Sequence, residues 1–391
     1  MTNKTFSFLN RRAQAEFTDR ENPRESFDRH LSQTIMTAKS DVSSMRVLQY
    51  YGIAGIGKTR LAKEFRKSLT EKHPTMPIST LDFDDPSTRS LSRGLLRMRT
   101  SIEPTNAIKF TLFDLAYAIF FKKRNPDYAF EKKSLPFLDE ASVLGKIIGA
   151  IDGLGVVSAA TGVVELTKRY TDKLAISSEA KSALSALSDM TEKEISEVLP
   201  QFFAYDVNTY TKRTKNPFFT FIDTYEALWS DEAHKSEAFS RDAWVRDLVE
   251  ALENSLIVIT GREKLRWSEV NADFEKTVDA HLLGRLGERD TEKFLRSAGV
   301  KDASLIQSIV NISGGHPYYL DLCLDTIAQE GGKTIEKWPE AERDLFDRFA
   351  KSLTVQELAL LKRLAVVDAY DIEYAREAAS VPSLTLPTCS L

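Results

Sequence analysis

The chain has 391 residues, of which 42% are hydrophobic and 28% charged, and these values are typical of soluble globular proteins. This composition excludes a collagen-like chain, a low-complexity chain and a chain that is disordered throughout. The 53 Lys and Arg residues against 57 Asp and Glu give a net charge of −4, which provides no overall positive field for holding a polyanion. At about 150 residues per domain, the length predicts two or three domains.

The cysteines and the apolar segments predict a reducing, cytoplasmic setting. Cys323 and Cys389 are too few for a disulfide framework and do not have the spacing of zinc ligands. The N-terminal segment has no apolar core of signal-peptide length, because Asn10, Arg11 and Arg12 interrupt it. No uncharged run reaches the roughly 20 residues of a membrane-spanning helix without a break, so we expect no membrane partner.

Four short apolar runs predict the strands of a parallel sheet. The first covers residues 45–52 and ends at a glycine, and the second covers residues 77–85 and ends in turn residues. Residues 217–223 and 256–261 are continuous apolar runs, which are typical of parallel strands covered on both faces. Because helical patterns separate these runs, the sequence predicts an α/β fold with a parallel sheet.

Helical patterns occupy most of the remaining chain. From about 90 to 205 they continue without a clear strand signal, which predicts a large helical insertion into the sheet domain. After about 285, four further helical patterns follow one another, separated by Gly, Pro or capping residues, and they predict a separate all-helical domain. A last helix at 354–368 begins a unit that we expect to be incomplete.

Residues 52–59 match the P-loop pattern G-x-x-x-x-G-K-[ST] completely, and they follow an apolar strand and precede a helix. Glycines let the backbone curl so that N–H groups point at phosphate oxygens, and the helix N-terminus adds its dipole. We expect Lys58 to reach the β and γ phosphates and Thr59 to place its hydroxyl on Mg²⁺. The alternative is a glycine turn with an exposed lysine. The expected nucleotide-binding residues here are Gly52, Ile53, Ala54, Gly55, Ile56, Gly57, Lys58, Thr59 and Arg60.

Two acidic residues follow the third predicted strand. A P-loop site needs a carboxylate at the end of a neighbouring strand to hold the water shell of the metal, and Asp223 is the best candidate in the chain. With Thr59, it forms the expected metal-binding pair. Glu226 lies where the chain leaves the sheet and is a candidate for orienting or deprotonating the attacking water. The alternative for either residue is a favourable charge in the first turn of a helix.

An arginine follows the fourth predicted strand. Arg262 comes directly after the run 256–261, at the edge of the sheet where the phosphates would lie. Its guanidinium would sense the γ-phosphate through a charge-assisted hydrogen bond. The alternative is a solvated surface arginine, which is the commoner role of an arginine just past a strand. The expected catalytic residues are therefore Lys58, Asp223, Glu226 and Arg262.

With these residues in place, the sequence resembles the STAND class of signal-transduction P-loop ATPases, relatives of the NB-ARC and NACHT modules, over most of the chain. Residues 52–59 resemble the Walker A motif of that class. Residues 217–229 resemble its Walker B strand, with Asp223 as the Walker B acid and Glu226 at the downstream acidic position. Arg262 resembles the sensor arginine that reads the γ-phosphate.

Two further segments resemble parts of the adenine site in this class. Asp-Arg-Glu at residues 19–21 resembles an opening segment that helps to wall the adenine, which implies a nucleotide contact for Arg20. The sequence Gly-Gly-His-Pro at 314–317 by itself fits a helix that ends at a glycine, followed by a proline that starts the next helix. It also resembles the G-x-P motif of the helical lid, which implies that Pro317 lies against the adenine.

The resemblance implies a molecular switch that binds ATP or ADP with Mg²⁺ and hydrolyses ATP slowly. Nucleotide exchange would open the protein and lead to homo-oligomerisation in signal transduction or defence, in response to a protein or pathogen-derived trigger. The implied domains are a nucleotide-binding domain at 1–284, a helical lid at 285–350 and an incomplete winged helix at 351–391.

Two other functions stay open at this point. One is an AAA+ DNA-dependent ATPase resembling archaeal replication initiators, because the first 75 residues contain 14 Lys or Arg against 8 Asp or Glu. The other is an interaction scaffold in which bound nucleotide is structural and is not hydrolysed.

Overall fold

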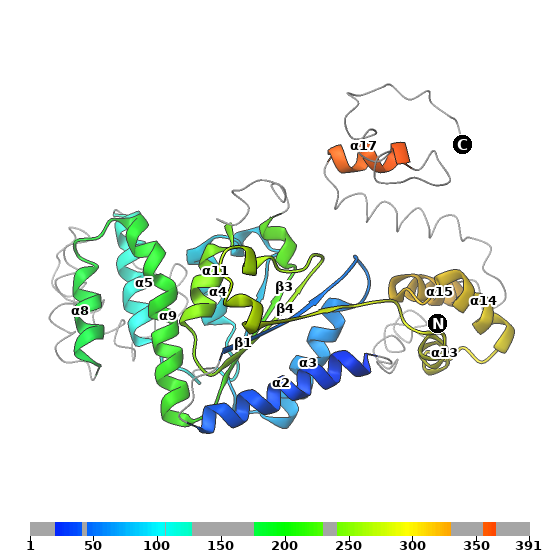
Figure 1. Cartoon of the computed structure of the whole chain (residues 1–391), viewed down its shortest axis with the longest axis horizontal. Coiled ribbons are helices and arrows are strands. Elements are labelled where there is room, and N and C mark those ends of the chain that lie inside the picture. The colour runs from blue at the N-terminus through cyan, green and yellow to red at the C-terminus, as the bar shows by residue number, and fades with distance from the viewer. Residues whose placement is uncertain are drawn as a thin grey trace, which may run out of the picture. The chain divides into compact units, whose positions relative to one another are not determined.

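The computed structural model describes residues 20–40, 45–105, 107–126, 176–229, 241–329 and 355–364. The chain divides into two compact units (Figure 1). The larger unit ends at Gly287, and the described helices from Glu288 onward belong to the other. In these described ranges, no helix has the length and apolar character that crossing a bilayer requires.

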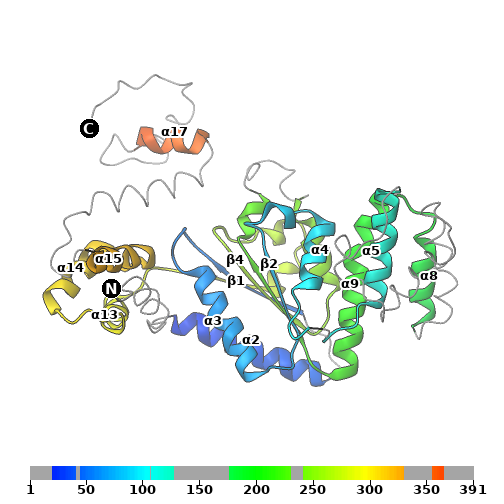
Figure 2. The same ribbon diagram turned by 180° about the vertical axis from the view of Figure 1, so that it is seen from behind.

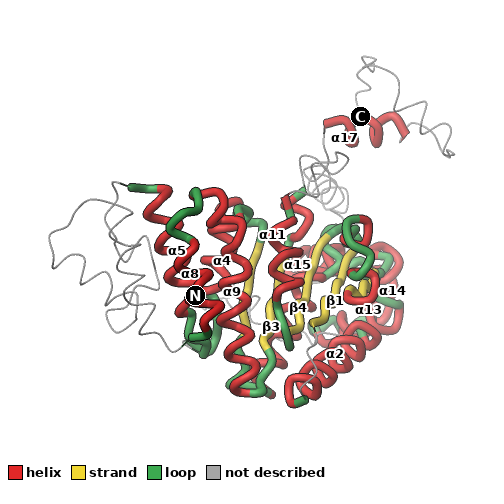
Figure 3. Tube along the Cα trace, turned by 60° about the vertical axis from the view of Figure 1, so that its left-hand side comes forward, coloured by secondary structure: helices red, strands yellow, loops and turns green. Residues whose placement is uncertain are grey.

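The larger unit is built on a five-stranded sheet in the order β2-β3-β4-β1-β5, in which all four strand pairings are parallel. Figure 3 shows strands β3, β4 and β1 of this sheet side by side. Residues of β3 and β4 are buried almost throughout, because helices cover both faces of the sheet. The strands are β1 (Met45–Tyr51), β2 (Ile78–Asp82), β3 (Phe218–Asp223), β4 (Ser255–Gly261) and β5 (Val278–Leu282).

Two helices cover one face of the sheet, α2 (Glu21–Lys39) and α3 (Lys58–Lys72) (Figure 1). The ring of Phe27 on α2 stacks on the ring of Phe65 on α3, with centroids 4.2 Å apart and planes nearly parallel. Phe65 also contacts Tyr50 of β1, so the two helices and the central strand share one aromatic cluster. This cluster fixes the helix that follows the glycine loop against the strand that precedes it.

The opposite face carries the main hydrophobic core, formed with α4 (Leu91–Thr100), α9 (Glu192–Thr214) and α11 (Ala243–Ala251). Figure 2 shows α5 (Thr111–Arg124) and α8 (Ser178–Ala186) stacked outward from α9, away from the sheet. α9 begins with a capping box, in which Thr191 and Glu194 satisfy each other's backbone N–H groups. Shorter elements complete this unit, namely η1 (Pro86–Thr88), η2 (Tyr225–Leu228), η3 (Trp267–Glu269) and α12 (Phe274–Thr277).

The second unit contains α13 (Glu288–Ser297), α14 (Ala303–Ser313), α15 (Pro317–Gln329) and α17 (Val355–Leu364). α14 ends at Ser313 and is capped by Gly314, which has a left-handed φ of 51°, and Pro317, three residues after this glycine, starts α15. The local prediction for Gly-Gly-His-Pro, a terminal glycine followed by a helix-starting proline, is therefore confirmed.

The predicted α/β class with a parallel sheet and added helices is confirmed. The four predicted strands are β1 to β4, although β2 ends at Asp82 rather than at residue 85. Of the predicted insertion at 90–205, the structure describes α4, α5, α8 and α9, and residues 127–175 lie outside the described residues. Cys389 and most of the predicted unit at 351–391 also lie outside them, as does Asp19.

The sequence prediction did not include two elements, β5 and α2. β5 is a five-residue edge strand that pairs only with β1 among the described strands, and ionisable residues occupy two of its five positions. α2 buries Ser26, His30 and Thr34 beside Phe27 and Leu31, so its buried face is partly polar. Both elements lack a continuous apolar pattern because they pack against each other through polar side chains.

A buried carboxyl group joins two helices of the insertion. Asp206 on α9 is 6% exposed, and its Oδ2 accepts a hydrogen bond of 2.9 Å from the backbone N–H of Phe113 in the first turn of α5. Burial raises the pKa of Asp206 to about 8, against the lowering effect of the bond from Phe113, and the nearby charge of Asp114 adds to the increase. The protonated form is therefore favoured in the folded protein up to this pH.

We expect Asp206→Asn, which keeps the acceptor oxygen and removes the charge, to stabilise the protein more at pH 8 than at pH 5. A carboxyl group whose pKa rises from 3.8 to about 8 on folding contributes stability below pH 4 that is lost as the pH rises to 8. Urea unfolding should show a gain of about 1–3 kcal/mol at pH 8. The exposed control Asp189→Asn should have no such effect, and a gain of equal size at both pH values would contradict the prediction.

Candidate functional site

Three chain segments meet at the carboxyl edge of the sheet. They are the glycine loop after β1 and the turns after β3 and β4, and they meet because the carboxyl ends of parallel strands lie at one edge. In the register of the sheet, Tyr51 lies opposite Gly261, and Asp82 lies opposite Asp223. Residues that are far apart in the sequence are therefore neighbours at this edge.

A side chain would be strained at Gly52 and at Gly57, the first and last glycines of the loop. Gly52 has a φ of 151°, and a Cβ atom on it would lie 2.8 Å from the carbonyl oxygen of Leu283. Gly57 has a φ of 98° and is the residue before the first turn of α3. Within the part of the chain that the structure describes, the N–H groups of residues 53–57 donate to no acceptor. These donors and the N-terminus of α3 form a site that fits an anion such as phosphate.

The side chain of Lys58 folds back over this loop. Its Nζ donates hydrogen bonds of 2.7 Å to the carbonyl of Gly52 and 2.9 Å to the carbonyl of Ile53. Burial lowers the pKa of Lys58 to about 8, the nearby Glu226 acts in the opposite direction, and Arg262 lowers the pKa further. These effects show that the lysine lies within electrostatic reach of both other groups.

Thr59 and Asp223, the expected metal-binding pair, line one cleft of about 340 Å³. Thr59 is in the first turn of α3 and Asp223 is at the end of β3. Oδ1 of Asp223 accepts hydrogen bonds from the hydroxyl of Thr260 and from the N–H of Thr224, the latter at 2.9 Å. A hydroxyl and a fixed carboxylate at one cleft fit Mg²⁺, which keeps most of its waters and needs few protein oxygens.

Glu226 and Arg262 form an ion pair at the same edge of the sheet. Nε of Arg262 lies 3.0 Å from Oε1 of Glu226, and the backbone N–H of Arg262 donates a 3.0 Å hydrogen bond to Oε2. The carboxylate lies against Gly261, where a Cβ atom would be 3.4 Å from Oε2. The charges of Glu226, Arg262 and Asp223 all act on Lys58, so the four groups share one electrostatic environment.

A buried polar cluster supports the residue before Glu226. Asp242 is fully buried, and its carboxylate accepts hydrogen bonds from the hydroxyl of Tyr225 at 3.1 Å and from the indole N–H of Trp267 at 2.9 Å. Arg246 pairs with the other oxygen of the same carboxylate. Sequence reasoning missed this cluster, because nothing in the local pattern around residue 242 indicates that its carboxylate is buried.

Arg20 contacts the glycine loop through its guanidinium. It donates a 2.8 Å hydrogen bond to the carbonyl of Ile56 and a 2.7 Å hydrogen bond to the carbonyl of Gly284, and it is 7% exposed. Arg20 therefore ties the start of α2 to the loop and to the exit of β5, and its adenine contact stays a prediction. The same holds for Pro317, which starts α15 in the other unit, and for Arg60, which lies half-buried on α3.

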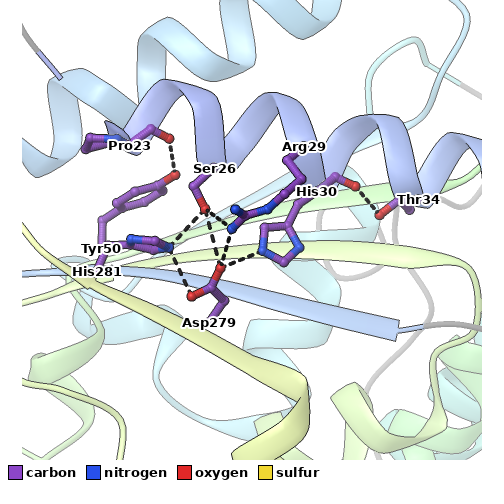
Figure 4. Close-up of polar contacts among 8 residues, drawn as sticks. All are labelled: Pro23, Ser26, Arg29, His30, Thr34, Tyr50, Asp279 and His281. Carbon is purple, nitrogen blue, oxygen red and sulfur yellow. Dashed lines mark hydrogen bonds and ion pairs between the residues drawn. The ribbon is translucent and has the colours of Figure 1, made fainter. Parts of the chain in front are cut away.

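A second polar cluster fastens α2 to the edge strand β5 (Figure 4). Asp279 of β5 lies 2.7 Å from Nε2 of His30 on α2, and burial tends to raise its pKa, but hydrogen bonds with His30 and His281 hold that pKa below its usual value. The hydroxyl of Tyr50 on β1 donates a 2.6 Å hydrogen bond to the carbonyl of Pro23. The side chains around Asp279 are Ser26, Arg29, His30 and His281.

Comparisons with known proteins give no family for this chain. No family model matches it, and no curated protein matches it. Among solved structures, the Aeropyrum pernix ORC2 protein, described as ADPNP-ADP complexes, is similar over 93% of this chain and 80% of its own, with 11% identity and a TM-score of 0.38. The HORMA:CdnC:Trip13 complex of E. coli MS115-1 is similar over 80% of this chain and 78% of its own, with 11% identity and a TM-score of 0.34. We base the site on the chain's own geometry.

We expect Arg20→Met to destabilise the protein even without nucleotide, by about 2 kcal/mol, because the buried carbonyl of Ile56 and the carbonyl of Gly284 lose their charged donor. Chemical denaturation of nucleotide-free protein measures this effect. Arg24→Met, at an exposed position on the same helix, is the matched control. If Arg20 served only to contact bound nucleotide, its replacement would leave the nucleotide-free stability unchanged.

Proposed function

We propose that this chain is an ATP- and ADP-binding switch of the STAND type, which hydrolyses ATP slowly with Mg²⁺. The observation that carries this proposal is the meeting of a glycine loop, Lys58, Asp223 and a Glu226–Arg262 pair at one edge of a parallel sheet. A loop with free N–H donors and a lysine can bind phosphate. One carboxylate can bind a metal, and the other can bind a water.

In the proposed reaction, each residue acts on a different part of the phosphate chain. Thr59 directly, and Asp223 through water, would hold Mg²⁺, and this ion would supply charge that neutralises the phosphate oxygens. Lys58 leaves the carbonyls of Gly52 and Ile53 and donates to the β and γ phosphates. Glu226 orients the attacking water for in-line displacement and accepts its proton.

The Glu226–Arg262 ion pair gives the site a nucleotide-dependent element. A γ-phosphate competes with Glu226 for the guanidinium of Arg262, because both ligands are anionic oxygens. When Arg262 turns to the phosphate, the Glu226 carboxylate is released to bind water. ATP and ADP therefore differ in their affinity for the two arrangements, which is the condition for a ligand to shift a conformational equilibrium.

In this proposal, the exchange of partners at Arg262 changes the arrangement of the domains. Residues 1–284 form the nucleotide-binding domain, residues 285–350 the helical lid with Pro317 toward the adenine, and residues 351–391 the start of a winged helix. ADP favours the closed arrangement of these domains, and ATP favours an open one that self-associates. The trigger that promotes exchange is a protein or a pathogen-derived ligand.

We expect Lys58→Ala to weaken binding of ATP and ADP by about 10- to 100-fold, because a charge-assisted contact to phosphate is lost. Asp223→Asn should retain ADP binding and lose at least about 100-fold in Mg²⁺-dependent turnover. Fluorescent-nucleotide titration and phosphate release measure the two effects. Lys67→Ala, exposed on the same helix as Lys58, is the control. Nucleotide binding that survives Lys58→Ala unchanged would refute the assignment of the loop.

Size-exclusion chromatography with mass measurement tests the assembly step. Protein loaded with ADP should elute as a monomer, and protein loaded with a non-hydrolysable ATP analogue should elute with a multiple of that mass, because only the ATP state exposes the assembling surface. Lys58→Ala should remain monomeric with either nucleotide. A mass that is the same in both nucleotide states would show that exchange does not drive self-association.

A further inference from the structure

Thr224, between the two carboxylates of the proposed site, has a left-handed backbone conformation with φ 55° and ψ 43°. Non-glycine residues rarely adopt this conformation, and a β-branched residue does so only when its surroundings hold it there. Thr224 is one residue after Asp223 and two residues before Glu226. Something near the site must therefore compensate for the strain of this turn.

The compensating contacts come from the ends of two neighbouring strands. The hydroxyl of Thr224 donates a 2.8 Å hydrogen bond to Oδ1 of Asp82, at the end of β2. The N–H of Thr224 donates a 2.9 Å hydrogen bond to Oδ1 of Asp223, at the end of β3. Asp82 and Asp223 lie opposite each other in the sheet register, so the threonine is held from both sides. The N–H of Asp84 donates to Oδ1 of Asp82 at 3.0 Å and fixes that carboxylate in turn.

The conformation of Thr224 determines the path of the chain toward Glu226. Thr224 is the residue before η2, and its carbonyl accepts the 3.0 Å hydrogen bond from the N–H of Ala227 that closes the first turn. Glu226 lies in that turn, with its carboxylate against Gly261 and paired with Arg262. A different backbone conformation at Thr224 would rotate the turn and move this carboxylate.

We propose that Asp82 is a positioning residue, which acts through Thr224 to hold the turn that places Glu226 for hydrolysis. This inference rests on the proposed function. Asp82 lines the same cleft as Thr59 and Asp223, but its oxygen Oδ1 is used by Thr224 and Asp84. In this proposal Asp82 acts on the geometry of the turn through its Oδ1 atom.

Four single variants separate this role from the alternatives. Thr224→Val keeps the shape of the side chain and removes its hydroxyl donor, whereas Thr224→Ser keeps the donor. Asp82→Ala removes the acceptor, whereas Asp82→Asn keeps an acceptor oxygen and removes the charge. Asp84→Ala, an exposed carboxylate two residues further on, is the matched control.

We expect Thr224→Val and Asp82→Ala each to lower kcat for ATP hydrolysis by about tenfold, because displacing a catalytic group by about 1 Å costs up to about 100-fold. The KM for ATP, the Kd for ADP, the Mg²⁺ concentration for half-maximal activity and the thermal midpoint should change little. Asp82→Asn and Thr224→Ser should retain most of the activity. The double variant Thr224→Val with Asp82→Ala should be no slower than either single variant, because both remove one interaction.

Three results would overturn the inference. Unchanged kcat in Thr224→Val would show that the hydroxyl bond does not position Glu226. A large rise in the Mg²⁺ requirement of Asp82→Asn would show that Asp82 acts on the metal through its charge. If wild-type protein binds nucleotide but does not hydrolyse it, both the proposed hydrolysis and the positioning role are wrong, whereas the first two results leave the hydrolysis intact.

Discussion

The close approach of Gly52 to the exit of β5 is the constraint on which the site depends. The backbone of Gly52 passes so near the carbonyl of Leu283 that a Cβ atom would lie 2.8 Å from it, and its N–H donates a 3.3 Å hydrogen bond to the carbonyl of Gly261. The glycine loop therefore begins between the exits of two strands. Arg262 follows Gly261 directly, so the same contact that fixes the start of the loop also fixes the distance from the loop to the arginine.

The two cations of the proposed site, Lys58 and Arg262, each have partners within the protein. Lys58 donates to two carbonyls of its own loop, and Arg262 pairs with Glu226. Both cations thus have partners that phosphate oxygens can replace. Because burial lowers the pKa of Lys58 to about 8, its charge is held less firmly than that of an exposed lysine, and an incoming phosphate would restore it. Binding and rearrangement are therefore coupled through the same two side chains.

The sequence predicted the parts of the site that are local in the chain and missed the parts that depend on strand neighbours. The glycine loop and the strand before Asp223 have patterns that a single segment contains, and β1 and β3 confirm them. No local sequence feature distinguishes Asp82 from Asp84 and Asp85. Asp82 lies near Thr224 because it is opposite Asp223 in the register of the sheet. The edge strand β5 was missed for a similar reason, since its polar residues are matched by α2.

The polar contacts between α2 and β5 explain how the glycine loop is held at Ile56. The side chains of Ser26, His30 and Asp279 fasten α2 to β5. Arg20 is the residue before α2, and its guanidinium donates hydrogen bonds to the carbonyls of Ile56 and Gly284. A helix held by apolar contacts alone can slide along a strand, whereas hydrogen bonds at defined positions fix its register. The loop is thus constrained at Gly52 by the sheet and at Ile56 by Arg20 before any phosphate arrives. Such preorganisation reduces the ordering cost of binding and accounts for the polar residues on the buried face of α2.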